Sequence, residues 1–208
     1  RPETSDDRWV QAALTVEGRI SNLDLIYAGS YLKRDVDTES DYSDYSYWYD
    51  TLLGYGAYWY DDDGVPIDPT QYIQGKDRYN RYTHELRLAS DADQRFRFVL
   101  GAFVQRQEHD IQQRYMIDGL GSQISVTGWE DTIWLTKQLR VDKDWALFGE
   151  FTFDFTEKLS VTVGARYFDS DNSLEGFFGY SEGYSSRTGE AACPGGDHTT
   201  APDFNGAP

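Results

Sequence analysis

Apolar and polar side chains alternate along residues 146–168, ALFGEFTFDFTEKLSVTVGARYF, on both sides of a break at residues 156–158. Successive side chains of a β-strand point to opposite faces, so this alternation predicts two strands that each have one apolar face. The break predicts a tight turn that joins the two strands into a hairpin. The register that collects the apolar side chains on one face pairs Phe155 with Leu159, Phe153 with Val161 and Phe151 with Val163.

Two further segments repeat this design. Residues 84–107, HELRLASDADQRFRFVLGAFVQRQ, alternate around a break at residues 91–93. The expected register there pairs Ser90 with Gln94, Leu88 with Phe96 and Leu86 with Phe98. Residues 11–34 alternate less regularly around a turn near residues 20–22, where we expect Leu14 and Val16 to face Tyr27 and Leu25. The chain therefore has predicted hairpins at about 10–34, 83–107 and 143–170.

The connections between these hairpins are long. Residues 35–79 and 108–131 are polar and residues 172–208 end in a segment rich in glycine and proline, so we expect loops in all of them. A β-sandwich has short connections at both ends, and long irregular loops are uncommon in compact domains. Short turns at one end and long loops at the other are typical of barrels in the bacterial outer membrane.

The two faces of the predicted strands differ strongly. One face carries Phe, Leu, Val and Tyr, and the sequence offers no helix or second sheet to cover it, so lipid is the expected neighbour. The other face carries charged and hydroxyl side chains that suit a wetted lumen, with Glu150 and Arg166 close enough to pair. We therefore expect an all-β fold, an antiparallel transmembrane β-barrel fragment of about six strands. Such barrels begin at about eight strands, so the chain reads as a piece of a larger one.

The composition argues against a nucleic-acid partner and agrees with a β-sheet protein. The net charge is −17, with 36 Asp and Glu against 19 Lys and Arg, so the basic surface needed to bind nucleic acid is missing. Aromatic residues make up 16% of the chain, which favours strands over helices. No stretch reaches the ~18 consecutive apolar residues of a membrane-spanning helix, but that test does not detect membrane strands.

Two of the hairpins carry a family resemblance. Residues 83–110, THELRLASDADQRFRFVLGAFVQRQEHD, resemble the hairpin of TonB-dependent outer-membrane receptors in which an ELRL strand, an acidic turn and an FRWVAGxFYQ-type strand follow one another. Residues 146–168 resemble the ALFGExxYxLTxxLxLTxGLRYx hairpin of the same family, and residues 21–35 are a looser match. The two stronger matches cover about 50 of the 208 residues.

The resemblance implies a larger protein and a transport function. It implies a barrel of about 22 strands that is plugged by a separate N-terminal domain. The plug, and the segment that contacts the TonB energy-coupling complex, would precede residue 1. The implied function is energised uptake of a scarce nutrient, such as a ferric siderophore, haem, cobalamin or an oligosaccharide, across the outer membrane of a Gram-negative bacterium. No catalytic motif is present, and we expect neither an enzyme nor a resident cofactor.

The aromatic clusters of the first long loop are the candidate ligand-binding residues. Residues 35–79 contain 11 Tyr or Trp, and rigid aromatic side chains with polar tips suit sugar rings or aromatic chelates. The candidates are Tyr47, Trp48, Tyr49, Tyr58, Trp59 and Tyr60. The alternative interpretation is that these side chains hold the loop together or belong to the aromatic girdle at the membrane interface.

A metal site is not expected. The run Asp61 to Gly64 has the start of a calcium loop, but Trp59 and Thr70 occupy the first and twelfth positions, where carboxylates are required. A turn is therefore the favoured interpretation. The single cysteine, Cys193, is either free or paired with a cysteine outside this sequence.

Two other functions fit the sequence less well. A passive, porin-like barrel has the same strand pattern but no plug. A secreted β-sandwich that binds carbohydrate through its Tyr and Trp clusters requires no lipid, so its solubility without detergent distinguishes it from a membrane barrel.

Overall fold

The computed structural model describes residues 1–47 and 59–180. These residues form one antiparallel sheet of six strands in sequence order, which confirms the all-β prediction. The strands are β1 (Thr4–Ile20), β2 (Leu23–Asp41), β3 (Tyr72–Ser90), β4 (Phe96–Met116), β5 (Thr132–Thr156) and β6 (Leu159–Tyr180). The only helix in the described residues is α1 (Ser43–Tyr47). No helix in this part of the chain is long and apolar enough to span a membrane.

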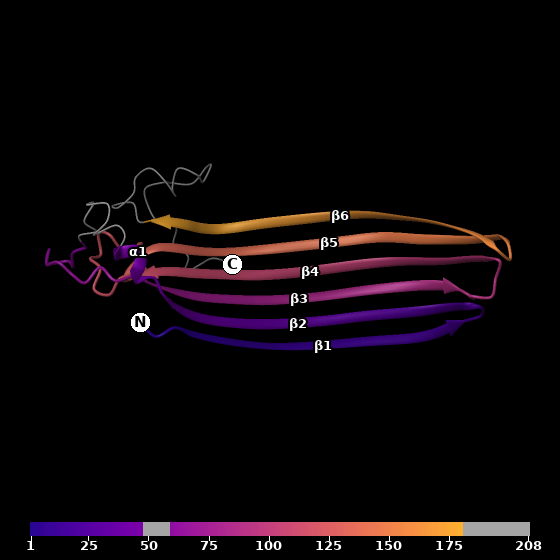
Figure 1. The fold of residues 1–208 in the computed structure, drawn as a ribbon, viewed down its shortest axis with the longest axis horizontal. Coiled ribbons are helices and arrows are strands. Elements are labelled where there is room, and N and C mark those ends of the chain that lie inside the picture. The colour runs from indigo at the N-terminus through magenta and orange to yellow at the C-terminus, as the bar shows by residue number, and fades with distance from the viewer. Residues whose placement is uncertain (48–58, 181–208) are drawn as a thin grey trace.

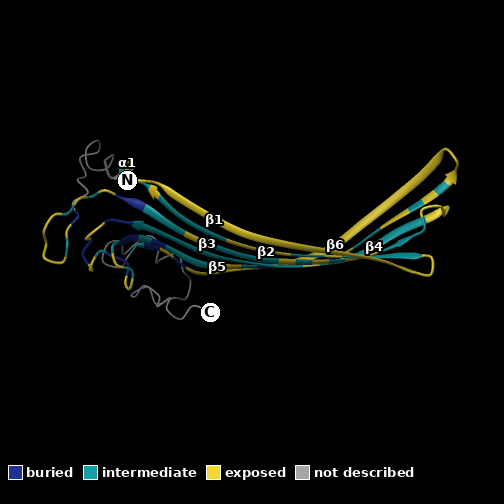
Figure 2. Cartoon of the chain, turned by 90° about the horizontal axis from the view of Figure 1, so that it is seen from below, coloured by how far each residue is buried: buried dark blue, intermediate teal, exposed yellow. Residues whose placement is uncertain are grey.

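The two ends of the sheet differ. Figure 1 shows tight turns between β1 and β2, β3 and β4, and β5 and β6 at one end, and the longer connections together at the other. We call these the turn end and the loop end. The sheet does not close, since β1 and β6 each have one unpaired edge, and Figure 2 shows both strands exposed along most of their length.

The strands extend further toward the loop end than the sequence pattern indicated. β2 continues to Asp41, β4 to Met116, and β5 begins at Thr132, so parts of the predicted loops 35–79 and 108–131 are paired backbone. Polar residues occur there on both faces, with Asp35 and Arg78 on one and Asp77 and His109 on the other, and this gives little alternation to detect.

The register of the β5–β6 hairpin is as predicted except next to the turn. Phe153 lies opposite Val161 and Phe151 opposite Val163. The expected pair of Phe155 with Leu159 is wrong, because a bulge between Asp154 and Thr156 shortens the turn to two residues, and Thr156 takes the place opposite Leu159.

The predicted register of the β3–β4 hairpin is wrong by four residues. Leu88 lies opposite Leu100, whereas Phe96 and Phe98 face Phe153 and Phe151 of β5. Residues just before β4 are held by β5 instead of β3, because the Arg95 side chain donates to the carbonyls of Asp154 and Phe155 at 2.7 and 3.0 Å. An even shift keeps every side chain on its predicted face.

The β1–β2 turn lies where it was expected. Ser21 and Asn22 form it, and Ser21 adopts a positive φ of 59°. The register differs by two residues from the expected one: Val16 faces Tyr27, and Leu14 faces Gly29. The faces are again unchanged.

Buried apolar residues gather at the loop end. Trp59, Ile117, Leu120 and Ile133 form one cluster, and Val126, Leu135 and Phe177 form another. Leu135 and Ile117 are fully buried. The sheet between the loop end and the turn end has no such core in the described structure.

Candidate functional site

One face of the sheet is apolar and open. Residues paired across the strands place its side chains on a single side, including Leu14, Tyr27, Leu86, Leu100, Phe151 and Val163. Leu14 is 60% exposed and Val163 is 65% exposed. The exposed apolar side chains run over all six strands, and soluble monomers rarely display large continuous apolar patches. We call this side the apolar face.

The border of the apolar face toward the loop end runs obliquely across the strands. Its last apolar residue is Val10 on β1 and Tyr167 on β6. Residues that lie opposite one another on successive strands form a row that runs straight across the sheet. The row that contains Tyr167 on β6 contains Val16 on β1. Val16 lies six residues closer to the turn end than Val10, where the apolar face ends on β1. At ~3.4 Å per residue and ~4.8 Å between strands, the border is inclined by about 40° to the rows.

Aromatic side chains follow this border. Its members are Tyr31 on β2, Tyr82 on β3, Trp145 on β5 and Tyr167 on β6, all of them exposed. The ring centroids of Trp145 and Tyr167 are 5.6 Å apart. Between the border and the loop end, the same face carries charged pairs such as Arg78 with Asp35, at 3.1 Å.

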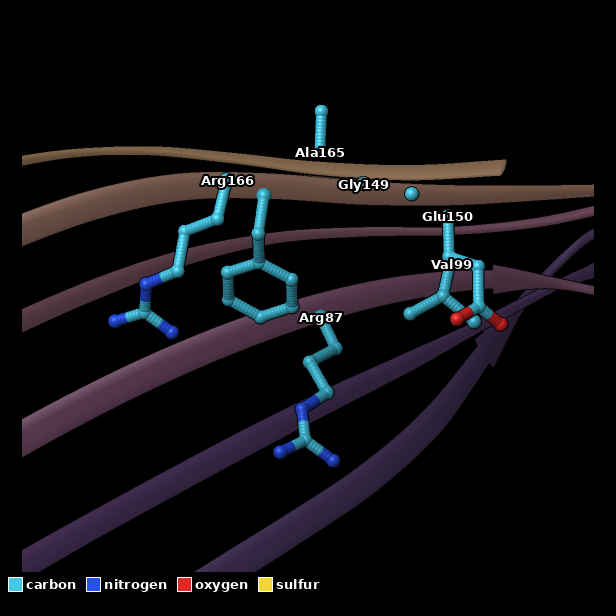
Figure 3. Close-up of a pocket in the computed structure, with 8 residues that line it drawn as sticks. Arg87, Val99, Gly149, Glu150, Ala165 and Arg166 are labelled. Atoms are coloured by element: carbon cyan, nitrogen blue, oxygen red, sulfur yellow. The ribbon is translucent and has the colours of Figure 1, made fainter. Parts of the chain in front are cut away.

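The opposite side, which we call the polar face, has a shallow hollow at the level of the apolar band. It is lined by Arg87, Phe148, Glu150 and Arg166, with Val99 and glycines between them. Figure 3 shows Arg87 and Arg166 extending to the same side of the sheet, while Ala165 points the other way. The Phe148 ring lies against Gly101 of β4, where any larger residue would collide with the ring.

The expected ion pair between Glu150 and Arg166 is not formed. The two side chains lie at opposite ends of the hollow in Figure 3. Arg166 is directly opposite Phe148, and its guanidinium lies 5.7 Å from the centroid of the Phe148 ring and 5.6 Å from that of Phe103. The aromatic contacts therefore take the place of the carboxylate.

A second polar group lies on this face nearer the loop end. Tyr79 of β3 and His109 of β4 are opposite each other, with stacked rings whose centroids are 3.8 Å apart. His109 Nε2 lies 3.0 Å from Asp77 Oδ1. Arg81 follows Tyr79 on the same face, between Leu32 of β2 and Gln107 of β4.

The predicted ligand-binding aromatics that the structure describes lie at the loop end. Trp48, Tyr49 and Tyr58 lie outside the described residues, and Tyr47 ends α1, with its backbone alone described. Trp59 is 7% exposed and is part of the loop-end core, whereas Tyr60 is 39% exposed. For Trp59 this is the position of a residue that holds the loop together, and its proposed contact with a ligand stays a prediction.

The loops after β2 and β4 contact each other directly. Gly121 N donates to the Tyr60 carbonyl at 2.9 Å, and Ser122 N donates to Asp62 Oδ1 at 2.6 Å. The bond from Ser122 lowers the pKa of the Asp62 carboxyl. The hydrogen bond from the Tyr72 hydroxyl likewise lowers the pKa of Asp118, which also receives a bond from Arg1. These contacts join the two loops and tie them to the first residues of β3.

The run of acidic residues in the first loop forms a turn. Asp61 Oδ1 accepts hydrogen bonds from the backbone of Asp63 and Val65 at 3.0 and 2.8 Å, and Gly64 has a φ of 76°. Within residues 1–47 and 59–180, no three His, Cys, Asp or Glu side chains are grouped as a metal site would require. Cys193 lies outside the described residues.

Sequence reasoning missed the group around Arg81. Tyr79, Arg81 and His109 fall in or beside segments that were assigned to loops, so their shared face was not apparent. The alternation that starts at His84 extends back through β3, and following it would have placed Tyr79 and Arg81 on the polar face.

Comparison with known proteins assigns no family. No protein-family model matches the chain, and no curated protein matches it either. The function must therefore be argued from the geometry of the sheet.

Proposed function

We propose that this chain forms part of the barrel wall of a TonB-dependent outer-membrane receptor that takes up a scarce nutrient. The apolar face would contact lipid, and the polar face would line the lumen. Charged and hydroxyl side chains are costly to place against hydrocarbon but stable in a wetted channel, which supports this orientation. The two unpaired edges, on β1 and β6, would be paired with further strands, because open edges in lipid leave backbone groups unsatisfied.

The observation that carries this proposal is the oblique apolar band. Its inclination of about 40° agrees with the tilt of strands in transmembrane barrels, about 35–45° from the barrel axis. On β6 the band runs from Leu159 to Tyr167. That length of nine residues matches the 9–11 residues with which a tilted strand crosses a bilayer.

The chemistry of the aromatic side chains at the border adds support. Trp and Tyr concentrate where the hydrocarbon of a membrane meets water, because their rings are apolar and their tips are polar. Tyr31, Tyr82, Trp145 and Tyr167 follow the oblique line that this membrane plane would take. The packed loops would then lie outside the cell and the tight turns in the periplasm.

In this mechanism the loops capture the ligand, with the aromatics around Trp59 and Tyr60 as candidate contacts. The ligand would move along the polar face after the inner-membrane complex, acting through TonB, displaces a plug. Binding and conformational change would accomplish transport, and no covalent step is required.

Energy dependence tests the proposal. The intact protein should fractionate with outer membranes, and uptake of its nutrient should stop when the proton-motive force is dissipated or TonB is deleted. Uptake that continues without energy would favour the passive, porin-like alternative. A protein that is monomeric and folded without detergent would support the secreted carbohydrate-binding alternative, although the described residues form one sheet and not the two of a sandwich.

A further inference from the structure

Some arginines of the polar face have a carboxylate partner and others do not. Several are neutralised by a carboxylate on the same face: Arg34 by Asp7, Arg87 by Glu85, Arg97 by Asp154 and Arg140 by Asp142. Arg81 and Arg166 have no carboxylate partner among the described residues. Arg166 instead lies beside two aromatic rings.

Arg81 is the anomaly. Its Nε is buried and has no hydrogen-bond partner within the described structure. A buried donor without a partner costs about 1–3 kcal/mol, and more when the group is charged, so such groups are rare unless something else binds them. Its neighbours across the strands, Leu32 and Gln107, supply no charge.

The carboxylates in the row of Arg81 and in the rows around it already have other partners. Asp77 lies against His109 at 3.0 Å, Asp142 accepts from Arg140 at 3.0 Å, and Asp144 accepts from Gln105 at 3.0 Å. None of them makes a hydrogen bond or an ion pair to Arg81 in the described structure. An oxyanion from outside this sheet would satisfy the guanidinium.

The surroundings favour a small oxyanion over a cation or an apolar group. The guanidinium is a planar fork of donors that matches two oxygens of a carboxylate or phosphate. The Gln107 side chain, whose amide has no hydrogen bond to the residues described, lies directly across from it as a second donor. The stacked rings of Tyr79 and His109 form a wall on the loop side.

We propose that Arg81 anchors a binding site for an oxyanion group, a carboxylate or phosphate, carried by the ligand. Arg81 precedes Tyr82 of the aromatic border, so in the receptor proposed above, on which this inference rests, the site lies at the outer mouth of the lumen. An anionic group captured by the loops would meet this cation before it reached membrane depth.

Inorganic phosphate is a suitable probe. The intact protein, labelled with ¹⁵N-arginine and folded in detergent micelles, is titrated with phosphate at constant ionic strength, and the Nε–H resonance of Arg81 is followed. We expect a saturable shift of that resonance. Arg81→Gln should weaken phosphate binding at least tenfold, and Arg81→Lys, which keeps the charge but loses the fork, should give an intermediate affinity.

The matched control is Arg78→Gln. Arg78 lies on the same strand but on the apolar face, where Asp35 and Asp37 already neutralise it, so phosphate affinity should not change. An Arg81 resonance that does not move, or equal affinities for Arg81→Gln and Arg78→Gln, would overturn the site. These outcomes are separate from the failure of the receptor proposal, which would show as a folded protein that needs no detergent.

Discussion

The loop end and the middle of the sheet differ in how far their apolar side chains are buried. At the loop end, Leu135 on β5 is 0% exposed and packs with Val126 and Phe177. Twelve residues along the same strand, Leu147 is 55% exposed on the apolar face. The loop end makes a core of its own, whereas the middle of the sheet leaves its apolar side chains exposed in the described structure.

This difference indicates where the protein depends on its surroundings. Removing a leucine side chain from water contributes about 1.5–3 kcal/mol to stability, whether the apolar neighbour is protein or lipid. At the loop end that neighbour is protein, which cannot flow into a gap. Over the band the proposed neighbour is lipid, which can. Substitutions in the two regions should therefore have different consequences.

The largest expected effect is Leu135→Ala. Removing a fully buried leucine leaves a cavity and should cost about 2–5 kcal/mol of unfolding free energy. Hydrogen exchange of amides in residues 117–134 should accelerate, because the loops pack on this cluster. Denaturant titration in lipid vesicles, combined with exchange measured by mass spectrometry, would detect both effects.

Leu147→Ala is the control for that change. It removes the same atoms from the same strand, but lipid should fill the gap, so only the transfer term of about 1–2 kcal/mol is lost. Exchange in the loops should not change. If both variants loosened the loops equally, the division of the molecule into a self-packed end and a lipid-dependent band would be wrong.

A somewhat smaller effect should separate the two faces. Val163 and Thr162 are neighbours on β6, with Val163 on the apolar face and Thr162 bonded to Thr152 on the polar face at 2.9 Å. Val163→Arg places a charge against hydrocarbon and should cost about 2–4 kcal/mol near the bilayer midplane. Folding into vesicles, followed by the altered gel mobility of the unheated protein, measures the loss.

Thr162→Arg provides the comparison for this second change. On a wetted face the new charge remains hydrated, so folding into vesicles should be nearly normal. Equal tolerance of both arginines would show that the apolar face does not contact lipid, and the receptor proposal would lose its main support.

The same contrast explains how far the sequence could predict the structure. Alternation specified the strands and the face of each side chain over the apolar band, and the errors in register, of four residues at β3–β4 and two at β1–β2, left the faces unchanged. Those registers depend on contacts from elsewhere, such as the hold of Arg95 on the end of β5. A single hairpin sequence does not contain that information.

At the loop end the sequence was less informative. The strand extensions there are polar on both faces, and Trp59 could not be distinguished as a core residue because its neighbours, Ile117 and Ile133, come from a distant loop and strand. Arg81 was also missed. The sequence alone does not indicate which arginines lack a carboxylate partner. That becomes apparent only when the strand pairing shows that the nearby carboxylates bond to other residues.

The smallest expected effect concerns acidity at the loop end. The Asp62 carboxylate accepts from Ser122 N, and this bond lowers the pKa of Asp62. A carboxyl whose pKa is lower in the folded state stabilises that state above the unfolded pKa of about 3.9, and loses this contribution as pH falls through the folded value.

Acidification from pH 5 to pH 3 should therefore loosen the contact between the two loops, whereas the apolar band should be insensitive. Asp62→Asn still accepts the bond but does not titrate at this position, so the protection of amides 119–124, measured relative to their intrinsic exchange rates, should depend less on pH. Asp63→Asn, one position along with no side-chain bond in the described structure, should retain the wild-type pH dependence. If Asp62→Asn and Asp63→Asn gave the same pH profile, the loop contact would not depend on the charge of Asp62.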